Sequence, residues 1–190
     1  RVSAIQEQQL TTYGGNITAL EVEGSFDDCQ HMVKEAFLDK SVNQRRPLSS
    51  ANSINIARLL PQSVYYAWAW KQINTDQPIV FSVPSGNFGN LTGGIIAKHM
   101  GLPVEKFIAA TNANDVFPKY LETGEFNGMP SKQTISNAMD VGRPSNFDRI
   151  LKIYNENVNE VRRDLISWSF QDDETKYAIQ YTKDKFNYLT

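Results

Sequence analysis

Cysteine and histidine are nearly absent from this sequence of 190 residues. Cys29 is the one cysteine, so the chain can form no internal disulfide, which is typical of a protein from a reducing compartment. The two histidines, His31 and His99, lie far apart along the chain. Because a structural zinc site needs several clustered cysteine and histidine ligands, we expect no metal site.

Long hydrophobic runs and an excess of one charge are also missing. No apolar stretch approaches the roughly 18 residues that a membrane span needs, and we recognise no signal peptide. The net charge is −2 and the basic residues are dispersed, so no basic patch marks a nucleic-acid-binding protein. We therefore expect a cytoplasmic protein without membrane or nucleic-acid partners, and the composition leaves its oligomeric state open.

Helix and strand patterns alternate along the chain. We predict helices at 3–12, 25–38, 53–73, 91–100, 115–122, 147–165 and 172–181, and strands at 17–22, 79–83 and 107–111. The 53–73 segment is apolar on nearly all sides, so we expect a buried helix with a kink at Pro61. Residues 39–52 are polar and contain a proline, which predicts a linker. Such alternation indicates an α/β architecture with parallel strands.

A turn rich in glycine and asparagine stands out from this pattern. The stretch VFSVPSGNFGNLTGGIIAKHMGLP (80–103) begins in a predicted strand, passes through a turn at 84–90 and enters a predicted helix. The first turn of a helix leaves backbone N–H groups free, and its dipole favours anions. Glycine lets the backbone approach a ligand closely. We predict an anion site suited to a phosphate, with further donors on Ser85, Asn87 and Asn90.

The spacing of the glycines excludes the two commonest nucleotide-binding loops. Gly86 and Gly89 are separated by two residues, which breaks the G-x-G-x-x-G pattern, and Gly94 is followed by isoleucines rather than Lys-Ser/Thr. Gly93 and Gly94 fall inside the predicted helix, where glycine is unfavourable, so we expect that helix to approach a sheet or a ligand closely. The alternative is a tight strand-to-helix turn that binds nothing.

The string PSGNFGN, followed by AKHMGLP, closely resembles the phosphate loop of pyridoxal-phosphate-dependent threonine synthases. Further segments agree in the same order: SAIQEQQLTTYGGNI, VEGSFDDCQHMVKEAF, SSANSINIARLLPQSVYY, AATNANDVFP and MDVGRPSNFDRI. The resemblance covers essentially the whole chain. The joint occurrence of FDDCQ, NSIN and GNFGN is far more specific than a single glycine loop.

This resemblance implies a fold type II pyridoxal-phosphate enzyme of the tryptophan-synthase-β-like architecture. That α/β fold is a three-layer sandwich with a parallel sheet, and it has two halves with the cofactor between them. This chain would contain only part of that fold. Residues 1–48 would end the first half, residues 49–75 would form a linker and a buried connecting helix, and residues 76–190 would form the second, phosphate-binding half.

The resemblance also implies the reaction and the cofactor site. Threonine synthases convert O-phospho-L-homoserine and water into L-threonine and phosphate, with pyridoxal 5′-phosphate as electron sink. Carried over by position, the residues that would bind the cofactor's phosphate are Ser85, Gly86, Asn87, Phe88, Gly89 and Asn90. For Phe88 the alternative is that its ring simply packs under the turn.

A second polar group lies at the start of the apolar 53–73 segment. Asn52, Asn55 and Arg58 are spaced by three, so they would share one helix face. We assign these three residues and Ser53 to substrate binding, in which Arg58 would bind a phosphate or carboxylate in bidentate fashion. The alternative is that Ser53 caps the helix and Arg58 pairs with a surface acid. A structural role is favoured for Asn112, Asn114, Asp140 and Asn146.

One feature of the family has no counterpart in this sequence. In threonine synthases a lysine in a Phe-Lys-Asp context forms the Schiff base with the cofactor, and no lysine here has that context; Lys34 and Lys98 look like solvated helix residues. We therefore assign no catalytic residue and expect the middle portion of a threonine synthase, inactive by itself. The alternatives are a threonine-synthase-like phospho-lyase and a non-catalytic phosphate-binding module.

Overall fold

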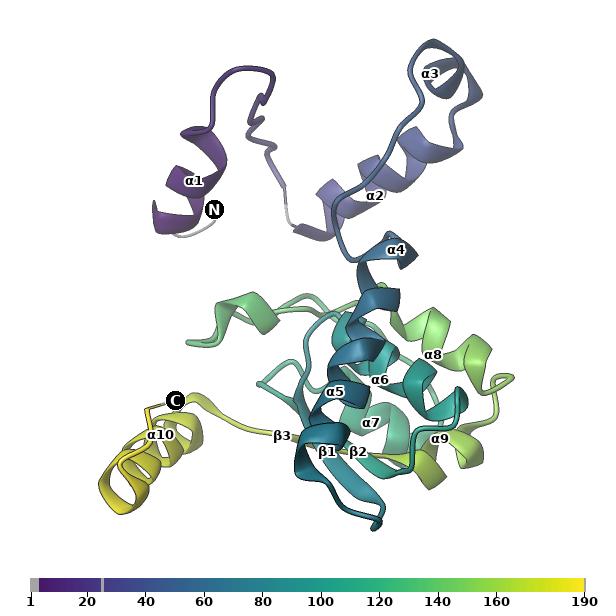
Figure 1. Ribbon diagram of the computed structural model, residues 1–190. Helices are drawn as coiled ribbons and strands as arrows, with labels where there is room; N and C mark the ends of the chain where they lie inside the picture. The colour runs from purple at the N-terminus through teal and green to yellow at the C-terminus, as the bar shows by residue number, and fades with distance from the viewer. Residues whose placement is uncertain (1–3, 25, 190) are drawn as a thin grey trace. The chain divides into compact units, whose positions relative to one another are not determined.

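The computed structural model describes residues 4–24 and 26–189. The chain divides into two compact units, the N-terminal unit Arg1–Leu48 and the C-terminal unit Ser49–Thr190. Figure 1 follows the chain through both, and each is described by itself below.

The N-terminal unit is helical in its described part. Its helices are α1 (Ala4–Thr11), α2 (Phe26–Leu38) and α3 (Lys40–Arg45). Asp39 begins α3, because its carboxylate accepts hydrogen bonds from Ser41 and from the backbone N–H of Val42. These hydrogen bonds hold the pKa of Asp39 below its usual value. The predicted linker at 39–52 therefore contains a short helix.

The strand predicted at 17–22 is wrong. This segment is irregular and exposed, with Leu20 83% accessible. A strand is held by hydrogen bonds to a neighbouring strand. All strands in the described part of the chain pair within the C-terminal unit, so alternating apolar residues alone do not make a strand here.

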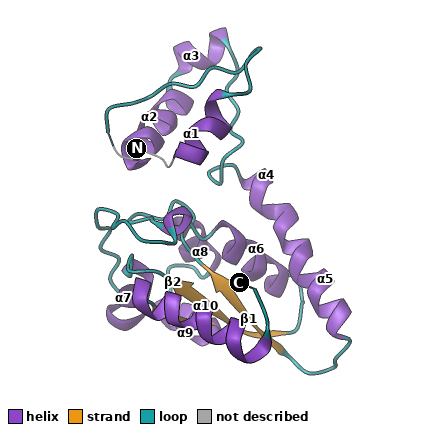
Figure 2. Cartoon of the chain, turned by 90° about the vertical axis from the view of Figure 1, so that its left-hand side faces the viewer, coloured by secondary structure: helices purple, strands orange, loops and turns teal. Residues whose placement is uncertain are grey.

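The C-terminal unit contains a small parallel sheet with helices around it (Figure 2). In chain order its elements are α4 (Ile56–Leu59), the 3₁₀ helix η1 (Leu60–Gln62), α5 (Ser63–Ile73), β1 (Ile79–Pro84), α6 (Gly89–His99), β2 (Val104–Thr111), α7 (Val116–Thr123), the 3₁₀ helix η2 (Asn137–Met139), α8 (Phe147–Ile153), α9 (Val158–Asp164), β3 (Leu165–Ser169) and α10 (Asp172–Phe186). The strand order is β1-β2-β3, and both pairs are parallel. The predicted α/β architecture with parallel strands is confirmed.

The core of this unit explains the glycines inside α6. Tyr66 from α5 packs edge-on against Phe81 of β1, with ring centroids 4.8 Å apart, and against Phe107 of β2 at 5.7 Å. A Cβ on Gly94 would lie 2.6 Å from the Tyr66 ring and 2.7 Å from that of Phe107. The predicted close approach of α6 to the sheet is therefore confirmed, and aromatic rings fill the space that a side chain would need.

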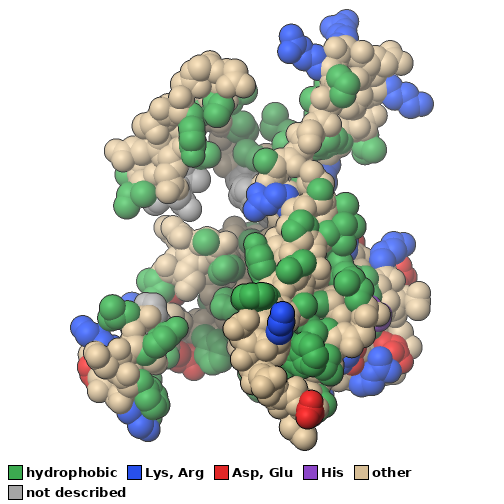
Figure 3. Space-filling model, in the orientation of Figure 1, with side chains coloured by type: hydrophobic (Ala, Val, Ile, Leu, Met, Phe, Trp, Pro, Cys, Tyr) green, Lys and Arg blue, Asp and Glu red, His purple; other side chains and the backbone are tan. Residues whose placement is uncertain are grey.

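The segment predicted as one buried helix at 53–73 differs in two ways. It begins at Ile56 and breaks into α4, η1 and α5, with Pro61 in the 3₁₀ turn as the expected point of interruption. It is also largely exposed: Tyr65 is 63% and Trp68 61% accessible, and hydrophobic side chains gather over this helix in Figure 3. Only the face that carries Tyr66 packs against the sheet and α6.

The single helix predicted at 147–165 is also wrong. The chain leaves α8 at Tyr154, and Asn155 and Glu156 take left-handed backbone angles, with φ of 51° and 61°. Asn157 then caps α9 by accepting from the N–H of Asn159 at 3.0 Å. The chain continues as β3, which begins at Leu165, the last apolar residue of the predicted pattern, and pairs with β2. A single apolar position fits a buried strand as well as a helix.

Candidate phosphate-binding site

The turn between β1 and α6 is held in an unusual backbone conformation. Phe88 has a left-handed conformation (φ 58°, ψ 14°) and stands directly before α6. Its carbonyl accepts hydrogen bonds from the N–H and the hydroxyl of Thr92, at 2.9 and 2.7 Å. Its ring is buried against Phe117, with centroids 4.8 Å apart. The ring thus anchors the turn from below, which is the packing role considered for it from the sequence.

The backbone of this turn offers a row of unused donors. Ser85 bonds through its N–H to the carbonyl of Ala110 at 2.8 Å. From Gly86 to Leu91, no backbone N–H has an acceptor within the described part of the chain. The first turn of α6 contains no acidic side chain that would compete for these donors. Free N–H groups at the positive end of a helix dipole form an anion-binding site.

The polar side chains of the turn are engaged within the protein. The Ser85 hydroxyl donates to the Val83 carbonyl at 2.8 Å. The amide of Asn87 donates to the hydroxyl of Ser53. The amide of Asn90 donates to Gln62 at 3.1 Å. The backbone rather than these side chains therefore supplies the free donors in this structure.

The second predicted set of residues, Asn52, Ser53, Asn55 and Arg58, lies partly beside the turn. Ser53 reaches it through its hydrogen bond with Asn87. Asn55 caps α4 by accepting from the N–H of Ala57 at 3.0 Å, and Asn52 accepts from the N–H of Ser53 at 2.7 Å. Because both asparagines precede the helix, the argument that they share a helix face with Arg58 is wrong.

Arg58 is turned back onto its own segment. Its guanidinium donates to the carbonyl of Ala51, and among the described residues it forms no ion pair with an acid. The capping role that the alternative interpretation gave to Ser53 falls instead to Asn55.

A cluster that the sequence did not assign to the site joins the turn from α8. The side-chain oxygen of Asn87 accepts from the hydroxyl of Ser145 at 2.9 Å, and the amide of Asn146 donates to the carbonyl of Asn87 at 2.9 Å. Arg149 donates to Asn146 and to the carbonyls of Ser53 and Ile54. Apart from the pair Arg149 and Asn146, these partners are about sixty to a hundred residues apart in the sequence, so no local pattern reveals them. The one sequence signal was the MDVGRPSNFDRI segment.

The asparagines after β2 form a closed network. The amide of Asn112 donates to Thr134 at 2.9 Å and to Asp140 at 2.8 Å, and Asn114 donates to the carbonyl of Lys132 at 2.9 Å. These bonds tie the 124–146 loop to the end of the strand. They agree with the structural role favoured for these residues from the sequence.

Lys98 is not the solvated lysine that we expected. Its ammonium lies 3.1 Å from the carboxylate of Asp164, whose side chain is 5% accessible. The hydroxyl of Tyr154 donates to the same carboxylate at 3.1 Å. Burial alone would raise the pKa of Asp164, but the hydrogen bonds from Lys98 and Arg163 outweigh it and lower this pKa. Lys98 therefore joins the end of α6 to the end of α9 through this ion pair.

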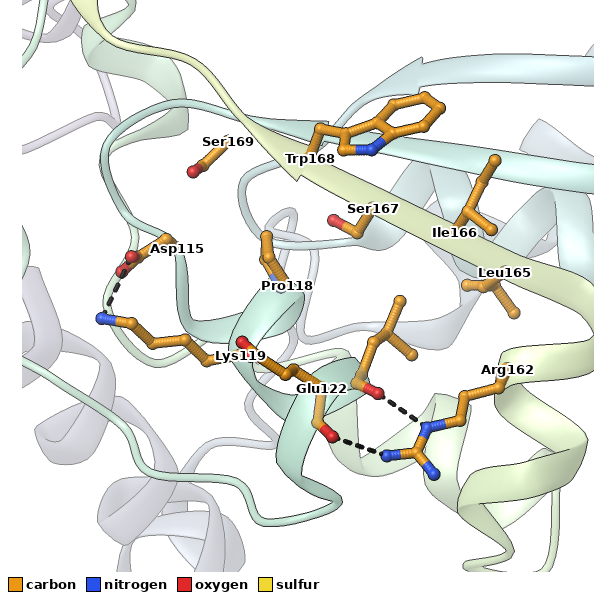
Figure 4. A pocket seen from close by; sticks show the side chains of 11 residues that line it. Asp115, Pro118, Lys119, Glu122, Arg162, Leu165, Ile166, Ser167, Trp168 and Ser169 are labelled. Carbon is orange, nitrogen blue, oxygen red and sulfur yellow. Dashed lines mark hydrogen bonds and ion pairs between the residues drawn. The ribbon is translucent and has the colours of Figure 1, made fainter.

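A hollow of about 590 Å³ lies elsewhere, between α7, α9 and β3 (Figure 4). Both of its cations have partners: Lys119 pairs with Asp115 at 3.0 Å, and Arg162 donates to the backbone carbonyls of Leu121 and Glu122. It shares no residue with the turn at 85–90. We do not assign it to the cofactor.

The described residues contain no group of three or more histidine, cysteine, aspartate or glutamate side chains that could hold a metal ion. Among their helices, none is both long and apolar enough to cross a membrane.

Comparison with known proteins places this geometry in a family. The pattern that defines the family described as "Pyridoxal-phosphate dependent enzyme" matches residues 1–180. The chain belongs to this family. Pyridoxal phosphate is therefore the cofactor to test against the turn between β1 and α6.

Individual members of the pyridoxal-phosphate-dependent family are close in sequence. Threonine synthase of Haemophilus influenzae is 44% identical over 187 residues, which are 97% of this chain and 44% of that protein. Threonine synthase of Escherichia coli is 44% identical over 177 residues, 92% of this chain and 41% of that protein. The chain thus spans less than half the length of these relatives.

Solved structures of family members agree. The crystal structure of threonine synthase from E. coli superposes with a TM-score of 0.89 at 40% identity, covering 98% of this chain and 44% of that one. The crystal structure of pyridoxal-phosphate-bound threonine synthase from Brucella melitensis has a TM-score of 0.83 at 35% identity, covering 100% of this chain and 46% of that one. Maize serine racemase, at 17% identity and a TM-score of 0.59, covers 97% and 53% and shows the shared fold alone. The expected fold type II architecture is confirmed.

The turn fits the phosphate of the family's cofactor. A dianionic phosphate needs several donors that converge without a competing acid, and the free N–H groups from Gly86 to Leu91 at the start of α6 offer them. Among the described residues outside its own helical turn, the atoms nearest to a Cβ on Gly89 would belong to Asn146 and Ser53, at ordinary contact distances of 3.6 and 3.7 Å, so no atom of theirs fills the place beside this glycine. The donor set is neutral backbone, which is the chemistry that suits a phosphate.

Proposed function

We propose that this chain is the middle portion of a threonine synthase, which converts O-phospho-L-homoserine and water into L-threonine and phosphate. The proposal is supported chiefly by the row of free N–H groups at 86–91, in a chain 44% identical to a threonine synthase over 97% of its length. The single cysteine fits a cytoplasmic location, which belongs to the same proposal.

In this proposal the two predicted groups of residues have separate tasks. The turn residues Ser85, Gly86, Asn87, Phe88, Gly89 and Asn90 hold the phosphate of pyridoxal phosphate, chiefly through backbone N–H groups. When bound, the cofactor supplies an electron sink for the loss of the substrate's phosphate and the addition of water. Asn52, Ser53, Asn55 and Arg58 bind the substrate, and the contact of Ser53 with Asn87 joins the two groups.

The division of the chain belongs to the same proposal. Residues 1–48 end the first half of the enzyme, residues 49–75 connect the halves, and residues 76–190 form the second half with the phosphate site. The loop at 84–90 follows the carboxyl end of β1, where open parallel sheets bind their ligands.

A binding experiment on the 190-residue chain tests the phosphate site. Titration with pyridoxal 5′-phosphate and with inorganic phosphate, followed by the backbone amide resonances, should shift Gly86 to Leu91 most. A chain whose resonances do not move with either ligand would contradict the site.

The reaction is tested on the complete protein that contains this sequence. Incubated with O-phospho-L-homoserine and pyridoxal phosphate, it should release threonine and phosphate. A keto acid in place of threonine would instead identify a phospho-lyase. The 190-residue chain alone should release neither product and should show no Schiff-base absorbance, because none of its lysines has the family's Phe-Lys-Asp context; turnover by this chain would contradict that expectation.

A further inference from the structure

Arg149 lies where segments from distant parts of the sequence meet. Its guanidinium donates to the backbone carbonyls of Ser53, at 3.2 Å, and Ile54, and to the side-chain oxygen of Asn146. All of these acceptors are neutral, and no carboxylate in the described part of the chain forms an ion pair with it. A half-buried cation with only neutral partners is expensive to keep for packing alone.

Asn146 links Arg149 to the turn between β1 and α6 by hydrogen bonds. It is fully buried, and its amide donates to the carbonyl of Asn87 at 2.9 Å, while its oxygen is held by Arg149. With both ends of its side-chain amide bonded, Asn146 has one orientation. The carbonyl of Asn87 is therefore fixed relative to α8.

Fixing that carbonyl also fixes a donor of the phosphate site. The peptide between Asn87 and Phe88 is planar and trans, so its N–H, on Phe88, points opposite to its carbonyl. When Asn146 draws the carbonyl of Asn87 toward α8, the N–H of Phe88 is directed away from α8. This N–H is one of the free donors of the turn.

We propose that Arg149, acting through Asn146, is a positioning residue for the phosphate-binding turn. It orients the Phe88 N–H and holds Ser53 at the turn, so that the turn has its ligand-binding shape before the ligand arrives. The inference rests on the proposed function, because it assigns Arg149 to the cofactor phosphate. A planar fork is needed to reach several carbonyl oxygens at once, which a lysine ammonium on its flexible stem does not reproduce.

The experiment compares three variants of the 190-residue chain. Arg149→Gln removes the fork, Arg149→Lys keeps the charge without the fork, and Lys152→Gln is the control. Lys152 lies on the same helix, and its substitution removes the same charge, but its side chain is 79% accessible and, among the described residues, forms an ion pair only with Glu156. Binding of pyridoxal 5′-phosphate is measured by calorimetry, and the amide resonances of 86–91 are recorded without ligand.

We expect Arg149→Gln to weaken binding about tenfold and Arg149→Lys about threefold, since a fixed donor to a charged group is lost or loosened. The ligand-free resonances of Phe88 and its neighbours should move in both Arg149 variants, and Lys152→Gln should change neither measurement. A merely structural role would lower the melting temperature and leave the affinity of the folded molecules unchanged.

Unchanged affinity in a folded Arg149→Gln variant overturns the inference, while leaving the phosphate site intact. If the Arg149→Gln variant does not fold, the Arg149→Lys variant tests the inference in its place. An Arg149→Lys variant that binds pyridoxal phosphate as tightly as the unsubstituted chain overturns the inference. An unsubstituted chain that binds neither pyridoxal phosphate nor inorganic phosphate refutes the proposed site, and the inference with it.

Discussion

Gly86 and Gly89 belong to the same turn, but a glycine is needed at each position for a different reason. A Cβ on Gly86 would lie 2.8 Å from the Cα of Met139, in the backbone of η2. A Cβ on Gly89 would meet Asn146 and Ser53 at ordinary contact distances of 3.6 and 3.7 Å. The protein's own packing thus requires the first glycine. The protein's packing does not require the second glycine, so the space beside Gly89 is explained by the close approach of the ligand.

A pair of alanine variants tests this distinction. Gly86→Ala should lower the free energy of unfolding by about 1–3 kcal/mol, because backbone atoms must move to accept the methyl group. Gly89→Ala should stay within about 0.5 kcal/mol of the unsubstituted chain, since alanine suits a helix start, but should weaken binding of pyridoxal phosphate. Denaturant unfolding and calorimetry measure the two effects. A Gly89→Ala chain that binds normally would show that the ligand does not approach this residue.

Asp164 offers a test of stability against pH. Its pKa is lowered in the folded protein, so its ion pair with Lys98 stabilises the fold above the pKa of the unfolded chain, which lies near the usual aspartate value of 3.8. This contribution is lost as the pH falls through the lower folded pKa. Asp164→Asn should lower the free energy of unfolding by about 3 kcal/mol at neutral pH, since Lys98 keeps some access to water, and should weaken the acid dependence of unfolding.

The control is Lys176→Ala, which breaks an exposed pair with Asp173 and should lower the free energy of unfolding by less than about 0.5 kcal/mol. Equal losses in the two variants would contradict the argument.

At the scale of elements, the interruption between α8 and α9 depends on the backbone rather than on side chains. Asn155 and Glu156 both have positive φ, a conformation that costs most residues about 1 kcal/mol and that asparagine tolerates better than glutamate. The only ion pair that Glu156 forms among the described residues is with Lys152 at 3.7 Å, and both side chains are exposed.

Glu156→Gly should therefore raise the free energy of unfolding by about 0.5–1 kcal/mol, because glycine adopts this conformation without strain. Glu156→Val should lower it, since a β-branched residue is the least tolerant of positive φ. Urea unfolding of the two variants measures both changes. Stabilisation by valine would mean that the break is not held in the left-handed conformation.

The same break shows how far the sequence could predict the elements. The βαβ unit from β1 to β2 and the glycine-rich turn inside it could be predicted, because glycine, asparagine and strand patterns are local. The split of the 147–165 segment could not, since one of the two residues that turn the chain is a glutamate and the apolar spacing continues through them. β3 is a strand only because β2 lies beside it, and Arg149 joins the site only because the fold brings residues 53 and 54 to α8. Contacts between residues far apart in the sequence determine these features, and local sequence patterns do not reveal such contacts.

At the scale of the whole molecule, the described core belongs to one unit. The buried hydrophobic residues run from Leu59 to Leu165, all within the C-terminal unit. In the N-terminal unit, large apolar side chains such as Ile5, Leu20 and Leu38 are 72, 83 and 82% accessible. Helices of this length gain most of their stability from tertiary packing, so the two units should differ strongly in stability.

Separate expression of the two units tests this difference. Residues 49–190 should unfold cooperatively in urea, with a midpoint close to that of the 190-residue chain, because the core and the β1–α6 turn are kept. Residues 1–48 should show weak helical circular dichroism and no cooperative transition, since 13-residue and shorter helices are marginal alone. Retained binding of pyridoxal phosphate by residues 49–190 would place the phosphate site within the C-terminal unit. Cooperative unfolding of residues 1–48 alone would show that this segment has a core of its own, against the exposure of its apolar side chains.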